Sequence, residues 1–148
     1  MNVVVANPNS LAFNGQLEQV IKLTKVMTKE LGYIMPIALR RAAVHGNVLW
    51  LMSNQLVLGF CYFHIRRKDK VGVIYDIATH PMIRNQGGGK QMIKAVLERC
   101  DKIELKCPVD NKSNGFYSRV AQLVRTEKGK NRMLNLWQIT HKTLEGSA

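Results

Sequence analysis

The sequence predicts a mixed α/β domain, in which short strands alternate with amphipathic helices along the chain. Apolar residues recur at three- and four-residue spacing in segments 16–31 and 90–100, which is typical of helices packed on a core. Between them lie three runs rich in β-branched and aromatic residues, joined by short polar turns as in an antiparallel meander. The chain of 148 residues has the usual length of a single domain.

The first elements are a short strand and two helices. β-branched residues predict the strand over 3–6. The first helix is expected over 16–31, and Gly32 follows it, as is typical of a helix C-terminus. The second helix is expected over 35–44, where Pro36 lies early enough that its missing N–H costs little.

The remaining elements lie between residues 48 and 140. In order, they are strands over 48–53, 55–67 and 71–79, a helix over 90–100, a strand over 102–107, a helix over 113–121, and strands over 123–126 and 132–140. The last segment, 142–148, is polar and is expected to fray. No composition shift marks an internal boundary, so we expect residues 1–148 to form one domain.

Positive charge is the unusual feature of the composition. The chain has 22 Lys and Arg against 10 Asp and Glu, a formal net charge of +12 at pH 7. Such a surplus attracts polyanions, which include nucleic acid, a membrane surface and a phosphate-rich cofactor. The charge does not by itself choose among these partners.

Cysteine usage and hydropathy exclude other classes of protein. Cys61, Cys100 and Cys107 are too few and too widely spaced for a disulfide scaffold, which favours reduced thiols in a cytoplasmic protein. Apolar stretches stay well short of the about 20 residues that a membrane span needs. The N-terminus also lacks the basic region and cleavage site of an export signal. We therefore expect a cytoplasmic protein without a membrane partner.

The most informative stretch is 77–93, where a strand runs into a glycine-rich turn that opens a helix. Glycines let the backbone approach a ligand closely, and the first N–H groups of the helix then point at it. With the helix dipole, this arrangement suits a pyrophosphate, although a flexible turn without a ligand also explains three glycines. A dinucleotide fold is excluded because G-x-G-x-x-G is absent. A phosphate-loop NTPase is excluded because the spacer and the magnesium-binding Ser or Thr are missing.

Two motifs resemble those of the GNAT superfamily of N-acetyltransferases. Arg84-x-x-Gly87-x-Gly89, preceded by His80-Pro81, resembles the family's acetyl-CoA pyrophosphate motif Q/R-x-x-G-x-G/A. About 22 residues later, Asn111-x-x-x-x-Phe116-Tyr117 resembles the second signature of the family. Two departures weaken this second match, since Asn114 replaces an alanine and Ala121-Gln122 replaces the final Gly-Phe.

The resemblance implies a fold and a cosubstrate. The expected sheet is central, mixed and mostly antiparallel, with about six or seven strands splayed between the fourth and fifth, and about four helices flank it. Acetyl-CoA would be the cosubstrate, with its pantetheine arm inserted at the splay. The backbone of Ile77, Ala78 and Thr79 would bind the pantetheine amides, and Asn111 would contact the same arm. The pyrophosphate would be held mostly by backbone N–H groups of Arg84, Asn85, Gln86, Gly87, Gly88, Gly89 and Lys90.

Acyl transfer to an amine needs an acid and a base. The coenzyme A thiolate must be protonated, and Tyr117 is our candidate acid, the alternative being a tyrosine that only packs its helix. Asp76 is the candidate base, although a structural ion pair or hydrogen bond also explains an acid in an apolar strand. His80 is expected to pack or cap at the turn, the alternative being a general base, and Cys107 is expected to be a buried structural thiol. His45, His64 and His141 are scattered, so no metal site is expected.

The acceptor is expected to be a primary amine that receives the acetyl group directly in a ternary complex. A cofactor cradle cannot account for the basic groups at residues 40–41, 66–70 and 125–132, which are either solvated turns or a surface for nucleic acid. The acceptor is therefore left open, including one on or associated with nucleic acid, and so is a homodimer. The alternative function is a basic nucleic-acid-binding module on a GNAT-like scaffold without turnover.

Overall fold

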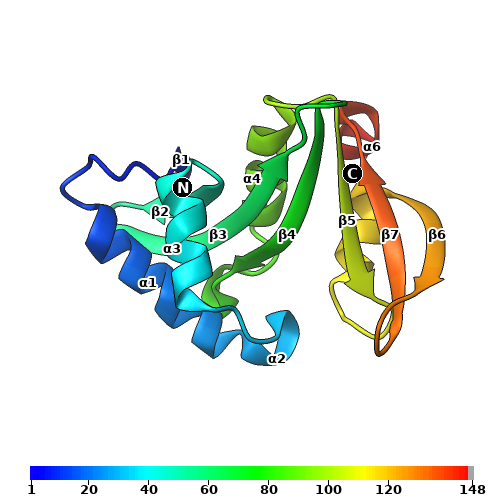
Figure 1. The fold of residues 1–148 in the computed structure, drawn as a ribbon, viewed down its shortest axis with the longest axis horizontal. Coiled ribbons are helices and arrows are strands. Elements are labelled where there is room, and N and C mark those ends of the chain that lie inside the picture. The colour runs from blue at the N-terminus through cyan, green and yellow to red at the C-terminus, as the bar shows by residue number, and fades with distance from the viewer. Residues whose placement is uncertain (147–148) are drawn as a thin grey trace. The chain divides into compact units, whose positions relative to one another are not determined.

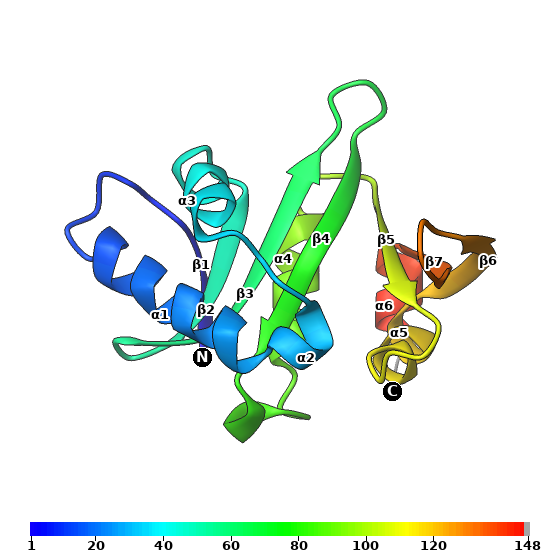
Figure 2. The same ribbon diagram turned by 60° about the horizontal axis from the view of Figure 1, so that its bottom comes forward.

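The computed structural model describes residues 1–146, which contain seven strands, six α-helices and one 3-10 helix (Figures 1 and 2). The strands are β1 (Asn2–Val5), β2 (Val48–Ser53), β3 (Leu56–Ile65), β4 (Val71–Thr79), β5 (Lys102–Pro108), β6 (Gln122–Lys128) and β7 (Met133–Ile139). The α-helices are α1 (Phe13–Val26), α2 (Thr28–Leu31), α3 (Pro36–Val44), α4 (Gly88–Leu97), α5 (Asn114–Val120) and α6 (His141–Glu145). The 3-10 helix η1 covers Pro81–Ile83.

The strands follow the order β1-β2-β3-β4-β5-β7-β6. The pairs β1–β2, β2–β3, β5–β7 and β6–β7 are antiparallel, and β4–β5 is parallel. The parallel ladder joins Val71–Val73 to Lys102–Glu104, at the N-terminal end of both strands. These findings confirm the predicted mixed, mostly antiparallel sheet. None of the helices in residues 1–146 has both the length and the apolar character of a membrane span.

The chain divides into two compact units. The first unit contains Met1–Phe63 and Asp76–Ile93, and the second contains His64–Tyr75 and the chain from Lys94 onward. Both β4 and α4 therefore contribute residues to each unit.

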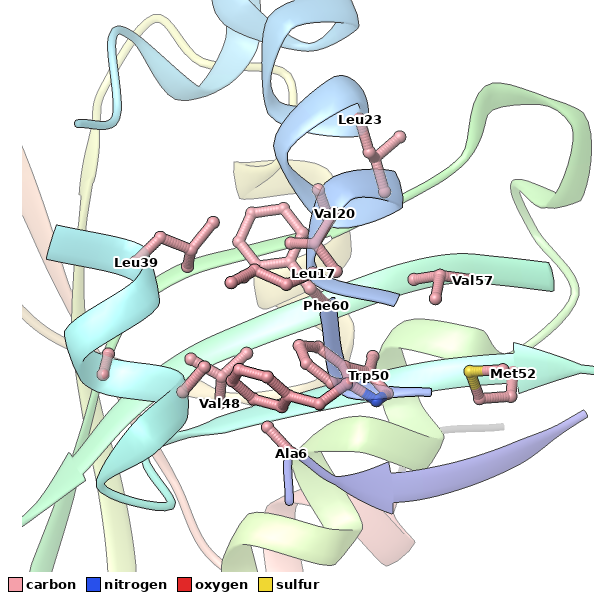
Figure 3. Packing of buried hydrophobic residues seen from close by; sticks show 14 of the residues in the cluster. Ala6, Leu17, Val20, Leu23, Leu39, Val48, Trp50, Met52, Val57 and Phe60 are labelled. Carbon is pink, nitrogen blue, oxygen red and sulfur yellow. The ribbon is translucent and has the colours of Figure 1, made fainter. Parts of the chain in front are cut away.

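In the first unit, helices cover both faces of β2. On one face, α1 and α3 pack their apolar stripes on the sheet, with Leu17 and Leu39 beside Trp50 and Phe60 (Figure 3). On the other face, Leu51 lies against the beginning of α4, where a Cβ built on Gly88 would come within 2.6 Å of its side chain. Because both faces are covered, the first five residues of β2 are all buried.

In the second unit, α5, α6 and the end of α4 supply apolar side chains to one face of the sheet. Buried residues there include Val96, Val120, Trp137, Ile139 and Leu144. Along β5, the buried Ile103 and Leu105 alternate with Glu104 and Lys106, as strand geometry requires. The charged residues therefore share the opposite face of the strand.

The predicted helix over 16–31 is interrupted in the structure. It ends at Val26, and a single turn, α2, follows Met27. The Thr28 hydroxyl donates to the carbonyls of Thr24 at 3.1 Å and Lys25 at 2.9 Å, and such bonds from a hydroxyl to the preceding turn bend helices. Gly32, with φ +76°, then ends α2 as predicted.

The segment predicted to fray, 142–148, instead begins as a helix. In α6 the Thr140 hydroxyl accepts from the Thr143 N–H at 3.2 Å, and the Thr143 hydroxyl accepts from the Thr140 N–H at 2.9 Å. This reciprocal cap and the burial of Leu144 fix a helix too short to show apolar periodicity. Residues 147–148 lie outside the described part of the chain.

Candidate functional site

The carboxyl end of β4 carries the candidate base. Asp76 is half-buried, and burial raises the pKa of its carboxyl group to about 6. The charge of Asp76 in turn helps burial to raise the pKa of the Cys61 thiol on β3. A carboxyl with a pKa near 6 is mostly ionised at neutral pH and can still take up a proton, as a general base must.

The other candidate residues on β4 lie in the packed part of the first unit. Ala78 is buried, and its carbonyl oxygen lies only 2.8 Å from a Cβ built on Gly59, so the β3 and β4 backbones approach closely there. Ile77 and Thr79 are half-buried, and the Thr79 methyl group lies against Gly88 at the start of α4. The strand end and the turn after it are therefore packed on one another.

The turn after β4 is fixed by a histidine cap and by left-handed backbone. His80 Nδ1 accepts from the Met82 N–H at 3.1 Å, which confirms the expected capping role and starts η1. Asn85 and Gly87 have φ values of 65° and 82°, a conformation in which asparagine and glycine are favoured. These residues reverse the chain between the strand and α4.

The start of α4 has the geometry of an anion site. The first helical hydrogen bond runs from the Gln91 N–H to the Gly87 oxygen at 3.0 Å, so the N–H groups of Gly88 and Gly89 have no acceptor within the helix. A Cβ on Gly87 would meet nothing within 4 Å, which leaves open space at the turn. Donor groups, the positive end of a ten-residue helix and open space fit a phosphate group.

Arg84 has a partner that the sequence did not indicate. Its Nη2 lies 3.3 Å from Oε1 of Glu30 on α2 and 3.6 Å from the Met27 sulfur. Both side chains of the ion pair are partly exposed. Glu30 lies 54 residues earlier in the chain, so no local pattern could have paired it with the turn.

Asn111 and Tyr117 belong to the second unit, where each is held by its neighbours. Asn111 Oδ1 accepts from the Ser113 N–H at 2.8 Å, just before α5. Tyr117 is 6% exposed, and its ring centroid lies 6.2 Å from that of Trp137 and 5.5 Å from that of Phe116. Tyr117 thus packs within an aromatic cluster, as the structural alternative expected, and its part in chemistry stays a prediction.

Neither nucleophilic catalysis by Cys107 nor metal binding is favoured by the described residues. Burial raises the pKa of the Cys107 thiol to about 11, so this group is protonated at neutral pH and is a poor nucleophile. Within residues 1–146, no group of three or more His, Cys, Asp or Glu side chains is placed to hold a metal ion.

The structure brings most of the predicted cofactor residues together. Asp76, Ile77, Ala78, Thr79, Arg84, Asn85, Gln86, Gly87, Gly88, Gly89 and Lys90 form one continuous strand, turn and helix start in the first unit. Asn111, in the turn before α5, and Tyr117, within α5, belong to the second unit. Their roles toward a ligand remain predictions.

Known proteins resemble this chain in sequence pattern and in fold. A sequence model described as the acetyltransferase (GNAT) family matches residues 20–121. The structure of Ard1 from Thermoplasma volcanium superposes with a TM-score of 0.72 at 14% identity, covering 94% of this chain and 96% of that one. An aminoglycoside 6'-acetyltransferase of type Ii gives a TM-score of 0.74 at 12% identity, over 95% and 97% of the two chains.

A third structure is that of an aminoglycoside 6'-N-acetyltransferase complexed with coenzyme A. It gives a TM-score of 0.73 at 11% identity, with 95% of this chain and 97% of that one covered. A search of curated protein sequences finds no match. At these identities the superpositions establish the fold, and the family match rests on the sequence.

Proposed function

The chain belongs to the GNAT family of acetyltransferases, and we propose that it transfers an acetyl group from acetyl-CoA to a primary amine. The observation that carries this proposal is the strand–turn–helix of residues 76–93. There, left-handed backbone at Asn85 and Gly87 precedes a helix whose first N–H groups have no acceptor within it.

We propose that the turn and the start of α4 hold the pyrophosphate of acetyl-CoA, through residues 84–90. Backbone N–H groups at the positive end of a helix suit this anion, and Lys90 adds a cation to the same turn. The backbone of Ile77, Ala78 and Thr79 would bind the pantetheine amides, and Asn111 would contact the same arm. When bound, the cosubstrate supplies an activated acetyl thioester.

The proposed chemistry is direct transfer within a ternary complex. An amine attacks only when neutral, so a base must take its proton, and the raised pKa of Asp76 supports this residue in that role. A backbone N–H at the end of β4 would donate to the carbonyl oxygen as negative charge develops there. Tyr117 would protonate the departing thiolate, because a phenol of ordinary pKa about 10 can give up a proton at this step.

Isothermal titration with acetyl-CoA tests the cofactor proposal. Binding in the micromolar range is expected, at about −8 kcal/mol. Absence of binding would favour the alternative of a GNAT-like scaffold without turnover. If acetyl-CoA binds, the acceptor can be identified by incubating protein, nucleic-acid and small-amine pools with labelled acetyl-CoA and analysing them by mass spectrometry.

Tyr117→Phe tests the acid role, with release of free thiol from acetyl-CoA as the measurement. Loss of the phenol should lower kcat by about 10²-fold or more, the usual contribution of a general acid, and leave acetyl-CoA binding nearly unchanged. Phe116→Leu, which alters the same aromatic cluster without removing a hydroxyl, is the matched control. An undiminished kcat in Tyr117→Phe would remove this residue from the mechanism.

We also propose that the acceptor is associated with nucleic acid, on the support of the net charge of +12. The exposed outer surface of the helices in the first unit carries five cations, namely Lys22, Lys25, Lys29, Arg40 and Arg41. α1 and α3 lie side by side, since Arg40 donates to Asn14 Oδ1 at 3.4 Å (Figure 1). Binding of a labelled tRNA should weaken steeply between 50 and 200 mM salt, and no binding at low salt would refute the proposal.

We also propose that the protein is a single domain in the cytoplasm. The family match over residues 20–121 runs through both compact units, which supports a single acetyltransferase domain over residues 1–148. The free thiols of Cys61, Cys100 and Cys107 support a reducing, cytoplasmic location. Light scattering on a sizing column would decide between a monomer and a homodimer.

A further inference from the structure

Asn114, the first residue of α5, has a side-chain amide that hydrogen-bonds to five other residues. Its Nδ2 donates to the carbonyls of Pro108 at 2.7 Å, Asn111 at 2.9 Å and Val109 at 3.3 Å. Its Oδ1 accepts from Trp137 Nε1 at 2.9 Å and from Asn135 Nδ2 at 3.1 Å. The amide has two N–H groups and two oxygen lone pairs, so all four are used, and the longest contact, to Val109, shares an N–H with another carbonyl.

These bonds join two parts of the unit that meet beside α5. Pro108 is the last residue of β5, and Val109 and Asn111 form the turn that leads to α5. Trp137 lies on β7, where it is 6% exposed. An indole N–H removed from water needs an acceptor, and the Asn114 oxygen supplies one. The amide therefore fixes the turn and the indole ring relative to each other.

Both candidate site residues of the second unit depend on what Asn114 holds. The Tyr117 ring lies one turn later on α5 and packs on the Trp137 ring at 6.2 Å. The Asn111 carbonyl accepts directly from Asn114, while the Asn111 side chain accepts from the Ser113 N–H. A shift of the indole or of the turn would therefore move the phenol and the Asn111 amide.

We propose that Asn114 is a positioning residue for acetyl transfer, which orients Tyr117 through Trp137 and orients Asn111 through its backbone. This inference rests on the proposed function, in which Tyr117 is the acid and Asn111 a contact for the cosubstrate. Asn114 itself touches neither reacting atoms nor substrate in this proposal. Its effect on kcat should therefore pass through Tyr117, and its effect on acetyl-CoA binding should pass through Asn111.

A double-mutant cycle between Asn114→Ala and Tyr117→Phe tests this coupling. In the wild-type background, Asn114→Ala should lower kcat by about tenfold, because a small misplacement of a catalytic group is costly. In the Tyr117→Phe background, the same change should cost less than about twofold. An equal loss of kcat in both backgrounds would overturn the inference, since a general loss of structure lowers both alike.

Controls separate this inference from folding and from the proposed function. Ser118→Ala, at an exposed position on the same helix whose hydroxyl donates to the nearby Gly115 carbonyl, should leave kcat unchanged. If Asn114→Ala does not fold, Asn114→Asp keeps the acceptor for Trp137 and loses the amide donors to the turn. Asn114→Asp should therefore leave kcat nearly unchanged and weaken acetyl-CoA binding through Asn111, and a loss of kcat with unchanged binding would overturn the inference.

If the wild-type protein shows no turnover, the proposed function is refuted. NMR spectroscopy then tests the positioning role by itself. In folded Asn114→Ala the ring resonances of Tyr117 should shift, and in folded Asn114→Asp the backbone resonances of Asn111 should shift. With Asn114→Ala, the indole N–H of Trp137 should also exchange faster. Unchanged Tyr117 resonances in Asn114→Ala, or unchanged Asn111 resonances in Asn114→Asp, would overturn the positioning role.

Discussion

At the scale of the single residue, Asp76 shows how a packed strand adjusts a carboxyl group. Burial disfavours the charged form, so the pKa rises to about 6 from its ordinary value near 3.8. The raised pKa means that the folded protein binds this proton more tightly than the unfolded chain does. The resulting stabilisation is complete below about pH 4 and is lost as the pH rises through about 6.

Asp76→Asn should therefore stabilise the protein in a pH-dependent way. At pH 8, the free energy of unfolding should rise by about 1–2 kcal/mol, less than the full shift implies because the group is partly solvated. At pH 4 the variant and the wild type should differ little. Urea unfolding at both pH values measures the difference, and a benefit as large at pH 4 as at pH 8 would contradict the assignment.

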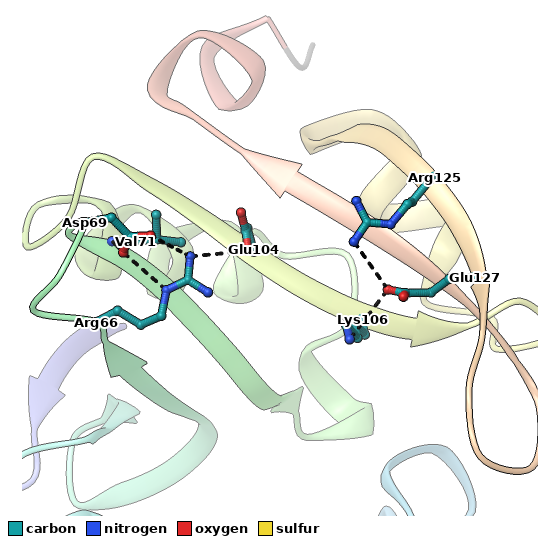
Figure 4. A network of polar contacts seen from close by, with 7 residues as sticks. All are labelled: Arg66, Asp69, Val71, Glu104, Lys106, Arg125 and Glu127. Carbon is teal, nitrogen blue, oxygen red and sulfur yellow. Dashed lines mark hydrogen bonds and ion pairs between the residues drawn. The ribbon is translucent and has the colours of Figure 1, made fainter.

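Asp69 is the matched control, because its pKa is shifted the other way. The Arg66 guanidinium donates to this carboxylate at 2.9 and 3.2 Å and lowers its pKa (Figure 4). The stabilisation from Asp69 is present above its unfolded pKa and is lost as the pH falls through the lower folded value. Asp69→Asn should accordingly weaken the protein at pH 8 and change it little in strong acid.

At the scale of the element, the strands were predicted best. The predicted bounds 48–53 and 71–79 are those of β2 and β4, because runs of buried β-branched and aromatic residues end at polar turns. Periodicity did not reveal the interruption at Met27 or the short α6, since both depend on threonine hydroxyls bonding to nearby backbone. Such local competition leaves the apolar pattern unchanged.

The candidate site was predictable only where its residues are local in sequence. The turn of residues 84–90 was predicted from its own glycines, which supply left-handed backbone at Gly87 and close packing at Gly88. The contacts of Glu30 with Arg84 and of Trp137 with Tyr117 were not predicted, because each joins segments that are distant in the sequence. Contacts between distant segments produce no local spacing pattern, so a single sequence does not predict them.

The start of α4 allows a sharp test of packing. A Cβ on Gly88 would lie 2.6 Å from the Leu51 side chain and 3.2 Å from that of Thr79. Gly88→Ala should therefore lower the free energy of unfolding by about 1–3 kcal/mol, the usual cost of overpacking. It should also weaken acetyl-CoA binding under the proposed function, because the first N–H groups of the helix would be displaced. Denaturant unfolding and titration measure the two effects.

Gly15 provides the control for Gly88. It also lies near the start of a helix, α1, but a Cβ there would meet nothing within 4 Å. Gly15→Ala should be neutral or stabilise the protein by up to about 1 kcal/mol, since alanine favours helix more than glycine does. Equal losses for both variants would mean that helix propensity, rather than the contact with Leu51, governs the position of Gly88.

At the scale of the whole molecule, much of the excess positive charge lies in turns. Two basic turns of the second unit, at residues 66–70 and 128–132, are separate from each other. In the second unit, the β3–β4 turn lies at the Lys102 end of β5, where Val71 pairs with Lys102. The β6–β7 turn lies at the Pro108 end, where Leu134 pairs with Pro108. Six residues of strand separate these ends by about 20 Å, so the two basic turns do not form one patch.

Few acidic groups are available to balance these cations. Glu127 is shared between Lys106 at 3.5 Å and Arg125 at 3.9 Å, and Arg66 is shared between Asp69 and Glu104 (Figure 4). These ion pairs are at least partly exposed and so contribute little each. With 22 cations against 10 anions, repulsion among like charges should outweigh their attraction.

The protein should therefore become more stable as salt is added. Raising sodium chloride from about 20 to 200 mM shortens the screening length to less than about 10 Å, which weakens repulsion between the separated basic groups. A gain of about 1 kcal/mol corresponds to a rise in Tm of about 2–4 °C for a chain of this size. Sodium sulfate at equal ionic strength separates screening from anion binding at α4, because bound sulfate would add a further rise that Gly88→Ala should reduce. A Tm that falls with chloride would mean that the ion pairs, not the net charge, dominate the electrostatics of the fold.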